Sequence, residues 1–309
     1  MDAELSPEAV EALHRRQMAE WPAARERYEA LYGVRTRQVR VGPARFIVQH
    51  NPARIGSTAA RVDSRQDQGG KCFLCAQNRP AEQRGIEWNG YDIEINPYPI
   101  FPRHLTIIAR RHEPQSIMEH VGDMLRLAAL LEGYTVFYNG PRCGASAPRH
   151  LHFQAVPSGK LPIEDEIASL AAQGGDGIWA AGLGRGTLVA RSADVAVAER
   201  LATALLSALP VPQGDREPMV NALCWRRDGS GWTVAVLPRR KHRPDCYYAT
   251  GEERVLVSPA SVDLGGVLVA PLEKDFERID AARIGSILAQ VCLGDEQATE
   301  LVSNLRIHI

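Results

Sequence analysis

The residues best suited to chemistry lie in one stretch, residues 138–154, where a loop of small residues runs into His150, His152 and Gln154 at alternate positions. In an extended strand, alternate side chains point to the same face, so we expect these three on one face and the apolar residues between them in the core. A neutral imidazole beside a loop whose amides can surround an anion can attack a phosphorus atom. The pattern predicts chemistry on a phosphate; the alternative is that both histidines are ordinary polar residues of a half-buried strand.

A Cys-x-x-Cys pair, Cys72 and Cys75, lies upstream of this stretch. Two thiolates at this spacing can bind one tetrahedral ion, and a structural zinc site needs two further ligands. The histidines available to supply them are His104, His112, His120 and His150. A redox function has less support, because the glycine-rich approach and polar continuation are not typical of a thioredoxin-like setting. We therefore favour zinc.

The elements that must position these residues are predicted by periodicity. Apolar residues alternate near residues 91–95 and 105–109, and prolines stiffen the turn between these two predicted strands. If the second strand runs unbroken, His104 and His112 project from the same face at opposite ends. Residues 117–134 are predicted to form the helix that crosses to the strand carrying the His-x-His-x-Gln motif.

The rest of the chain predicts further helices and strands around this core. A capping serine and a first-turn proline begin a helix over 6–32, and glycine punctuates a hairpin formed by 219–226 and 232–237. The remaining predicted elements are strands at 35–41, 45–50 and 267–271, helices at 195–209, 281–292 and 296–305, and a mobile loop at 52–71.

Composition limits the class of protein. The chain has 309 residues, of which 45% are hydrophobic and 24% charged, enough for one large domain or two modest ones. A net charge of −1 argues against a general nucleic-acid surface or a polybasic membrane anchor. The start of the chain does not resemble a signal peptide, and no apolar stretch approaches 18 residues. With six cysteines in a chain of this length, we expect a reducing cytoplasm rather than a disulfide framework.

The motifs together resemble the histidine-triad superfamily. The pattern is Asn-x-x-Pro-x-x-Pro-x-His-x-x-Ile-Ile, then a helix, then a strand ending in Asn-Gly-Pro-x-x-Gly, then His-x-His-x-Gln, and it covers about residues 72–157. Glutamine at the third triad position resembles the branch of galactose-1-phosphate uridylyltransferase, diadenosine tetraphosphate phosphorylase and GDP-L-galactose phosphorylase. The resemblance implies an α+β, HIT-like fold, an antiparallel sheet with crossing helices. It further implies a catalytic half at 72–165, a degenerate second half at 166–309, and an N-terminal segment, 1–71, packed on the core.

The resemblance also implies roles for individual residues. His152 matches the nucleophile, Gln154 the third triad position and His104 the histidine behind the triad. Asn96 matches the residue that contacts the ribose. In the uridylyltransferase branch the positions of Cys72, Cys75, His112 and His150 bind zinc, so the resemblance implies structural zinc held by these four residues.

The substrate phosphates need their own ligands. The loop of the Asn-Gly-Pro-x-x-Gly motif supplies Asn139, Gly144 and Ser146, of which Ser146 is our first choice for a phosphate contact. One concentrated basic patch lies at 238–244. Such a run is usually a solvated loop, but in a protein that holds a diphosphate we expect anion binding there. The residues chosen from it are Lys241, His242 and Arg243.

The predicted function is that of a nucleotidyltransferase or phosphorylase, acting on a nucleotide sugar or dinucleoside polyphosphate through a covalent nucleotidyl-histidine on His152. Either a backbone carbonyl or a second histidine, such as His104, would hold the far ring nitrogen and fix the tautomer. Inorganic phosphate or a sugar phosphate would be the acceptor. The alternatives are a HIT-type nucleotide hydrolase, which includes enzymes that process nucleic-acid ends, and a non-catalytic nucleotide-binding protein. A homodimer is the default assembly.

Overall fold

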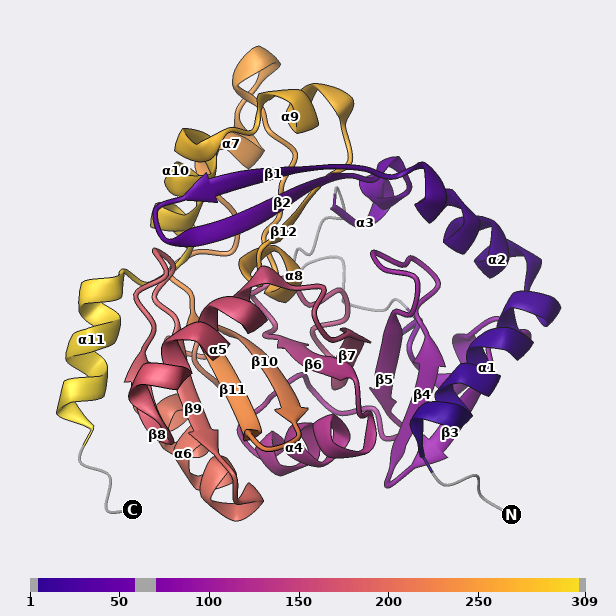
Figure 1. Cartoon of the computed structure of the whole chain (residues 1–309). Helices are drawn as coiled ribbons and strands as arrows, with labels where there is room; N and C mark the ends of the chain where they lie inside the picture. Colours follow the sequence, from indigo (N-terminus) through magenta and orange to yellow (C-terminus); the bar gives the residue numbers. More distant parts are fainter. Residues whose placement is uncertain (1–4, 59–70, 306–309) are drawn as a thin grey trace.

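A computed structural model describes residues 5–58 and 71–305 of the chain (Figure 1). The greater part of the predicted loop at 52–71 lies outside these residues, and the described beginning of it forms two short turns, Pro52–Arg54 and α3 (Ile55–Thr58). Among the helices of the described ranges, none is long and apolar enough to cross a membrane.

The centre of the molecule is a nine-stranded antiparallel sheet in the order β3-β4-β5-β7-β6-β10-β11-β9-β8. The strands from the predicted catalytic region are β3 (Gly85–Trp88), β4 (Tyr91–Ile95), β5 (Leu105–Ala109), β6 (Tyr134–Asn139) and β7 (His152–Pro157). Those that follow are β8 (Gly177–Ala180), β9 (Leu188–Ser192), β10 (Val220–Arg227) and β11 (Gly231–Pro238). β6 and β10 join the two groups, so one sheet runs through both. The division at residues 71 and 165 stays a prediction.

A smaller sheet is formed by β1 (Arg35–Val41), β2 (Ala44–His50) and β12 (Val267–Ala270). β1 and β2 form an antiparallel hairpin, and β12 pairs with β2 in parallel. The small sheet therefore ties the N-terminal segment to the C-terminal part of the chain.

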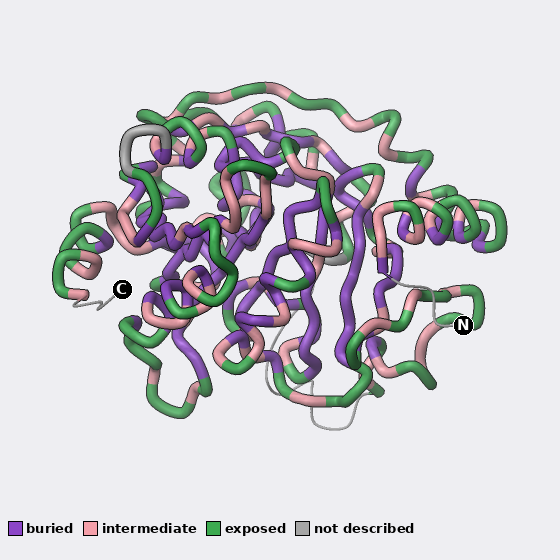
Figure 2. The backbone as a smooth tube through the Cα atoms, turned by 60° about the horizontal axis from the view of Figure 1, so that its bottom comes forward, coloured by how far each residue is buried: buried purple, intermediate pink, exposed green. Residues whose placement is uncertain are grey.

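The helices lie around the sheets. On the chain they are α1 (Pro7–Glu20), α2 (Pro22–Glu29), α4 (Val121–Leu130), α5 (Pro162–Gly174), α6 (Val195–Ser207), α7 (Asp245–Tyr248), α8 (Ser261–Leu264), α9 (Glu273–Arg278), α10 (Ala281–Val291) and α11 (Asp295–Asn304). Figure 2 shows that buried residues follow the central strands, whereas the exposed ones lie on the helices and the connecting loops.

Two apolar clusters cover the two faces of the large sheet. One packs α1, α2, α4 and α6 against strand residues such as Ile93, Phe153 and Val136. The other packs the small sheet, α5 and α10 against residues such as Phe137, Leu223 and Ala235. The second cluster draws its strand residues mainly from β6, β9, β10 and β11, so the same face over β4, β5 and β7 carries mostly polar side chains, with Ile108 and Val156 as its apolar members.

The predicted elements are found with changes at their ends. The helix predicted over 6–32 is broken at Trp21, where Pro22 takes the first turn of a second helix because it cannot supply the amide that the first helix would need. The crossing helix is shorter than predicted, since α4 begins only at Val121. The strand proposed to run from His104 to His112 ends at Ala109.

Candidate active site and metal site

His152 opens β7, and its ring is buried and held in one tautomer. Nδ1 lies 2.7 Å from the carbonyl oxygen of His150, so Nδ1 carries the proton and donates it. The other ring nitrogen, Nε2, therefore has a free electron pair, and it is buried without a hydrogen-bond partner among the described residues. Burial lowers the pKa of His152 to about 4, so the imidazole is neutral at physiological pH. We predicted that either a backbone carbonyl or His104 would bind the ring nitrogen that does not attack phosphorus. The structure shows the backbone carbonyl in this position and not His104.

Gln154 lies on the same face of β7, and two side chains hold its carbonyl oxygen. His104 Nε2 lies 2.9 Å from Gln154 Oε1, and Asn96 Nδ2 donates to the same oxygen at 3.2 Å. His104 can donate there because its Nδ1 accepts from the amide of Ile100 at 3.2 Å. With Oε1 occupied, the amide nitrogen of Gln154 is left to donate outward, with no protein acceptor in the described parts of the chain.

The loop of residues 140–149, named the phosphate loop after the ligand that its sequence predicts, contains free backbone donors. The amides of Gly144 and Ser146 have no protein acceptor within the described ranges, and Ser146 is exposed. Gly144 has φ +97°, and a Cβ there would lie 2.6 Å from the Cβ of Ala260, so only glycine fits. Exposed amides in a tight loop are suited to an anion.

Asn139, at the end of β6, is buried and oriented by two donors. Its Oδ1 accepts from Asn221 Nδ2 and from the amide of Ser261, each at 2.9 Å. Asn221 also donates to the carbonyl of Cys143 at 2.8 Å, so β10 supports the loop from behind.

Four side chains gather beside this strand as a cluster that can hold a metal ion. The ligand atoms of Cys72, Cys75, His112 and His150 all lie within 4.8 Å of one another. His150 Nε2 donates to the carbonyl of Ala109 at 2.7 Å, which fixes its tautomer and leaves Nδ1 facing the sulfurs at 3.2 and 3.7 Å. Two thiols and two imidazoles are a donor set suited to tetrahedral zinc.

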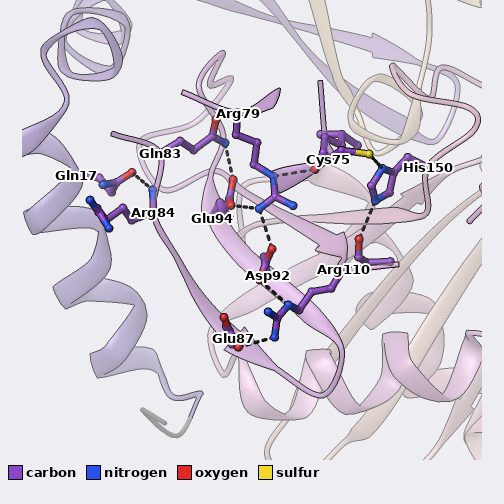
Figure 3. Close-up of polar contacts among 12 residues, drawn as sticks. Gln17, Cys75, Arg79, Gln83, Arg84, Glu87, Asp92, Glu94, Arg110 and His150 are labelled. Atoms are coloured by element: carbon purple, nitrogen blue, oxygen red, sulfur yellow. Dashed lines mark hydrogen bonds and ion pairs between the residues drawn. The ribbon is translucent and has the colours of Figure 1, made fainter. Parts of the chain in front are cut away.

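The loop that carries the two cysteines is fixed to β4 by Arg79 (Figure 3). Its guanidinium donates to the carbonyl of Leu74 at 2.7 Å, to Asp92 at 2.8 Å and to Glu94. Gln83 also donates to Glu94, at 2.6 Å. This network fixes the position of the cysteine loop relative to β4.

The other two candidate ligands lie elsewhere. His104 binds Gln154, as described above, and His120 lies 3.0 Å from Asp123 and 3.2 Å from the hydroxyl of Tyr91. His150 also departs from the expectation, because β7 begins at His152 and His150 lies in a turn closed by its amide and the carbonyl of Ala147. That turn allows His150 to face the cysteines rather than follow the strand.

The basic segment at 238–244 is connected to the phosphate loop through Arg239. Arg239 donates to the carbonyls of Lys241 and His242 at 3.1 and 2.8 Å, and to Asn221 at 2.6 Å. Lys241 itself forms an ion pair with Asp245, and Arg243 donates to Ser258 at 2.8 Å. Burial and nearby cations, among them Arg142 of the phosphate loop, lower the pKa of His242 to about 4.

Sequence reasoning missed three buried polar residues around the site: Gln115, Asn221 and Arg239. Asn221 lies within a strand and Gln115 within a loop, so neither forms part of a recognisable motif. Arg239 lies within the basic patch but was not among the residues predicted from it, although it is buried to the same extent as Arg243, which was.

The comparisons with known proteins agree with this fold. A family model described as a domain of unknown function (DUF4922) matches residues 13–157, and no curated protein matches the sequence. The yeast Ap4A phosphorylase Apa2 in complex with Ap4A is similar in structure, with a TM-score of 0.60 and 15% identity over 91% of this chain and 97% of that one. Its complex with AMP gives a TM-score of 0.59 at 15% identity, over 89% and 97%.

A GalT-like protein from Arabidopsis thaliana aligns over 82% of this chain and 99% of its own, with 14% identity and a TM-score of 0.36. The likeness to the yeast phosphorylase confirms the α+β, HIT-like fold expected from the motifs.

Proposed function

We propose that this protein is a nucleotidyltransferase of the phosphorylase type, which transfers a nucleoside monophosphate from a dinucleoside polyphosphate or a nucleotide sugar through His152. The observation that carries the proposal is the state of its ring: Nδ1 is tied to a carbonyl, and Nε2 is neutral, unpaired and available as a nucleophile. A buried nitrogen without a partner is costly, and such atoms occur where function requires them.

In the first step, the Nε2 electron pair of His152 forms a bond to the α-phosphorus, and the bond from that phosphorus to the bridging oxygen breaks. The rest of the polyphosphate leaves on that oxygen. Gln154 has no titratable proton and cannot act as a general acid. The leaving group must therefore already be a good one, as a phosphate is. In the second step, an oxygen of inorganic phosphate or a sugar phosphate bonds to phosphorus, and the phosphorus–nitrogen bond breaks.

The surrounding residues suit this chemistry. The amide nitrogen of Gln154 and the free amides of Gly144 and Ser146 can donate to phosphoryl oxygens, and donors placed where charge develops stabilise the transition state. The resemblance matches Asn96 to the ribose contact, and the loop motif supplies Asn139 as a substrate ligand; both roles are part of this proposal. We also assign Lys241, His242 and Arg243 to the distal phosphates, since Arg239 joins their segment to the phosphate loop.

The metal in this proposal is a structural zinc held by Cys72, Cys75, His112 and His150. When bound, it cross-links the cysteine loop to the turn before β7. Because His150 also supplies the carbonyl that fixes His152, this cross-link supports the nucleophile without touching the substrate.

The test is to mix the protein with diadenosine tetraphosphate, UDP-sugars and GDP-sugars, each with and without inorganic phosphate, and to follow the intact mass. We expect a mass increase of one nucleoside monophosphate on His152, removed on adding phosphate or a sugar phosphate. The adduct should be absent from His152→Ala and present in a control variant, His50→Ala. Turnover with water alone would indicate the hydrolase instead, and nucleotide binding without an adduct would indicate a binding protein.

A further inference from the structure

The strands β6 and β7 separate at the start of β7, where His152 lies. Their pairing runs from Tyr134↔Pro157 to Phe137↔Gln154 and then stops. Continued in register, the next pair of this parity would join Asn139 to His152. The backbone groups of His152 that would have faced β6 are instead bound by a side chain.

That side chain is Gln115, which is 1% exposed. Its Nε2 donates to the carbonyl of Asn139 at 2.9 Å and to the carbonyl of His152 at 3.0 Å. Its Oε1 accepts from the amide of His152 at 2.8 Å. One carboxamide thus replaces the missing stretch of strand pairing.

We infer that Gln115 is the positioning residue for the nucleophile: it holds the backbone of His152 on both sides while allowing β6 and β7 to part around the phosphate loop. This inference rests on the proposed function for its effect on catalysis. Gln115 acts through His152 and is not itself assigned any contact with substrate.

The placement of Gln115 is itself fixed. Its own amide donates to the carbonyl of Pro148 at 3.2 Å, and the amide of Leu151 donates to the carbonyl of Glu113 at 2.8 Å. Two residues further on, the amide of Ile117 donates to buried Glu217 at 2.7 Å. The segment before α4 is therefore pinned on both sides of Gln115.

The chemistry of the three contacts requires a carboxamide. Two carbonyls need two N–H donors, and one amide needs an acceptor, which is the full set that glutamine offers. Glutamate would keep the acceptor but would turn an oxygen toward two carbonyls. Methionine has a similar length and offers no conventional donor or strong acceptor.

Loss of this clamp should move the nucleophile rather than weaken substrate binding. In-line attack depends on the placement of Nε2, and a misplacement of about 1 Å can cost on the order of 10²-fold in rate. The ring tautomer of His152 would also be affected. The acceptor that keeps the proton on Nδ1 is the carbonyl of His150, two residues away on the same backbone.

The experiment compares Gln115→Met with Gln17→Met. Gln17 is a matched control, since it is also fully buried and also bridges two backbone groups, the carbonyl of Glu82 at 2.9 Å and the amide of Arg84 at 3.1 Å, at the far side of α1. The rate of adduct formation with diadenosine tetraphosphate and the nucleotide Kd are measured for both. We expect Gln115→Met to slow adduct formation at least tenfold with Kd changed less than threefold, and Gln17→Met to stay within twofold of wild type in both.

A second measurement does not depend on activity. Histidine labelled with ¹⁵N reports the ring tautomer, with the His152 signal assigned from its loss in His152→Ala. We expect an Nδ1–H tautomer in wild type and a mixture in Gln115→Met; Gln115→Glu replaces it if the methionine variant does not fold.

Unchanged adduct rates in the Gln115 variant, or an unchanged tautomer, would overturn the inference while leaving the proposed function intact. If wild type forms no adduct, the proposed function fails, and the tautomer alone then decides whether Gln115 positions the ring.

Discussion

Gln154 illustrates how hydrogen bonds from neighbouring residues orient one side chain. The histidine and the asparagine that bind its Oε1 determine which end of the amide faces outward, and neither of them has to touch the phosphate to do so. The replacement Gln154→Glu keeps the shape but substitutes an oxygen for the donating nitrogen and adds negative charge.

We expect Gln154→Glu to slow adduct formation about 10²-fold, the usual cost of losing one donor to a developing oxyanion. Rapid-quench measurement of the adduct tests this, with Gln38→Glu, an exposed position on β1, as the control. Equal rates for the two variants would show that the Gln154 amide does not face the phosphoryl group.

His104 predicts a pH dependence of stability. Its Nδ1 accepts from Ile100, and burial lowers its pKa from 6.5 to about 3, so the folded protein excludes a proton that the unfolded chain binds. The free energy of unfolding therefore falls as pH drops below 6.5 and is unaffected above it, with a loss of about 1.4 kcal/mol at pH 5.5 from this residue.

Urea unfolding of wild type and His104→Gln at pH 7.5 and 5.5 isolates this contribution from that of the other buried histidines. We expect wild type to be the more stable at pH 7.5, and its advantage to shrink by about 1.4 kcal/mol at pH 5.5. An advantage that stays constant would mean that His104 is not held neutral in the fold.

The motif residues could be predicted because their spacing encodes their chemistry. The cysteine pair and the alternating histidines carry that information locally. Gln115 and Asn221 could not be predicted, because each forms its important hydrogen bonds with residues distant in sequence, 37 and 82 positions away. No residue near either of them in the sequence indicates that it is buried.

Among the elements, the cysteine loop shows how a local turn brings candidate metal ligands together. The amide of Cys75 donates to the carbonyl of Cys72 at 3.2 Å, which brings both sulfurs to one side, and Arg79 fixes the loop to β4.

The ends of elements were the least predictable part of the fold. His150 lies in a turn rather than in β7, because the ligand cluster and the bond to Ala109 outweigh a weak local preference for strand.

Removal of the zinc proposed for this cluster should therefore affect stability and adduct formation at once. We expect Cys75→Ser, or treatment with a chelator, to lower the melting temperature by about 5–10 °C and to slow adduct formation, since the released His150 no longer presents a fixed carbonyl to His152. Cys246→Ser is the control, since Cys246 lies outside the cluster. Metal content measured alongside the melting curves tests the link; full activity in metal-free protein would contradict it.

Over the whole molecule, the site depends on parts of the chain that its motifs do not contain. The strand register links β6 to β10, and Asn139 binds Ser261, 122 residues away. A motif over residues 72–157 predicts the nucleophile and the metal ligands, but the support of the phosphate loop comes from residues beyond 200. Only the tertiary arrangement could reveal it.

Arg239 provides the sharpest test of that dependence. It is 6% exposed, and in the described chain its hydrogen bonds go to uncharged oxygens of Asn221, Pro259, Val291, Lys241 and His242. It thus joins β10, β11, α10 and the basic segment to the phosphate loop. Arg239→Met would leave several buried acceptors without donors, each costing about 1–3 kcal/mol.

We expect Arg239→Met to lower the free energy of unfolding by about 3 kcal/mol or more and to slow adduct formation with it, because Asn221 loses the partner that orients it toward Asn139 and Cys143. The neighbouring Arg240→Met is the matched control: Arg240 is exposed, and within residues 5–58 and 71–305 its side chain bonds only Gln297, so a change within about 0.5 kcal/mol is expected. Urea unfolding measures both variants. Equal stability of the two would mean that the C-terminal part supports the sheet without this arginine.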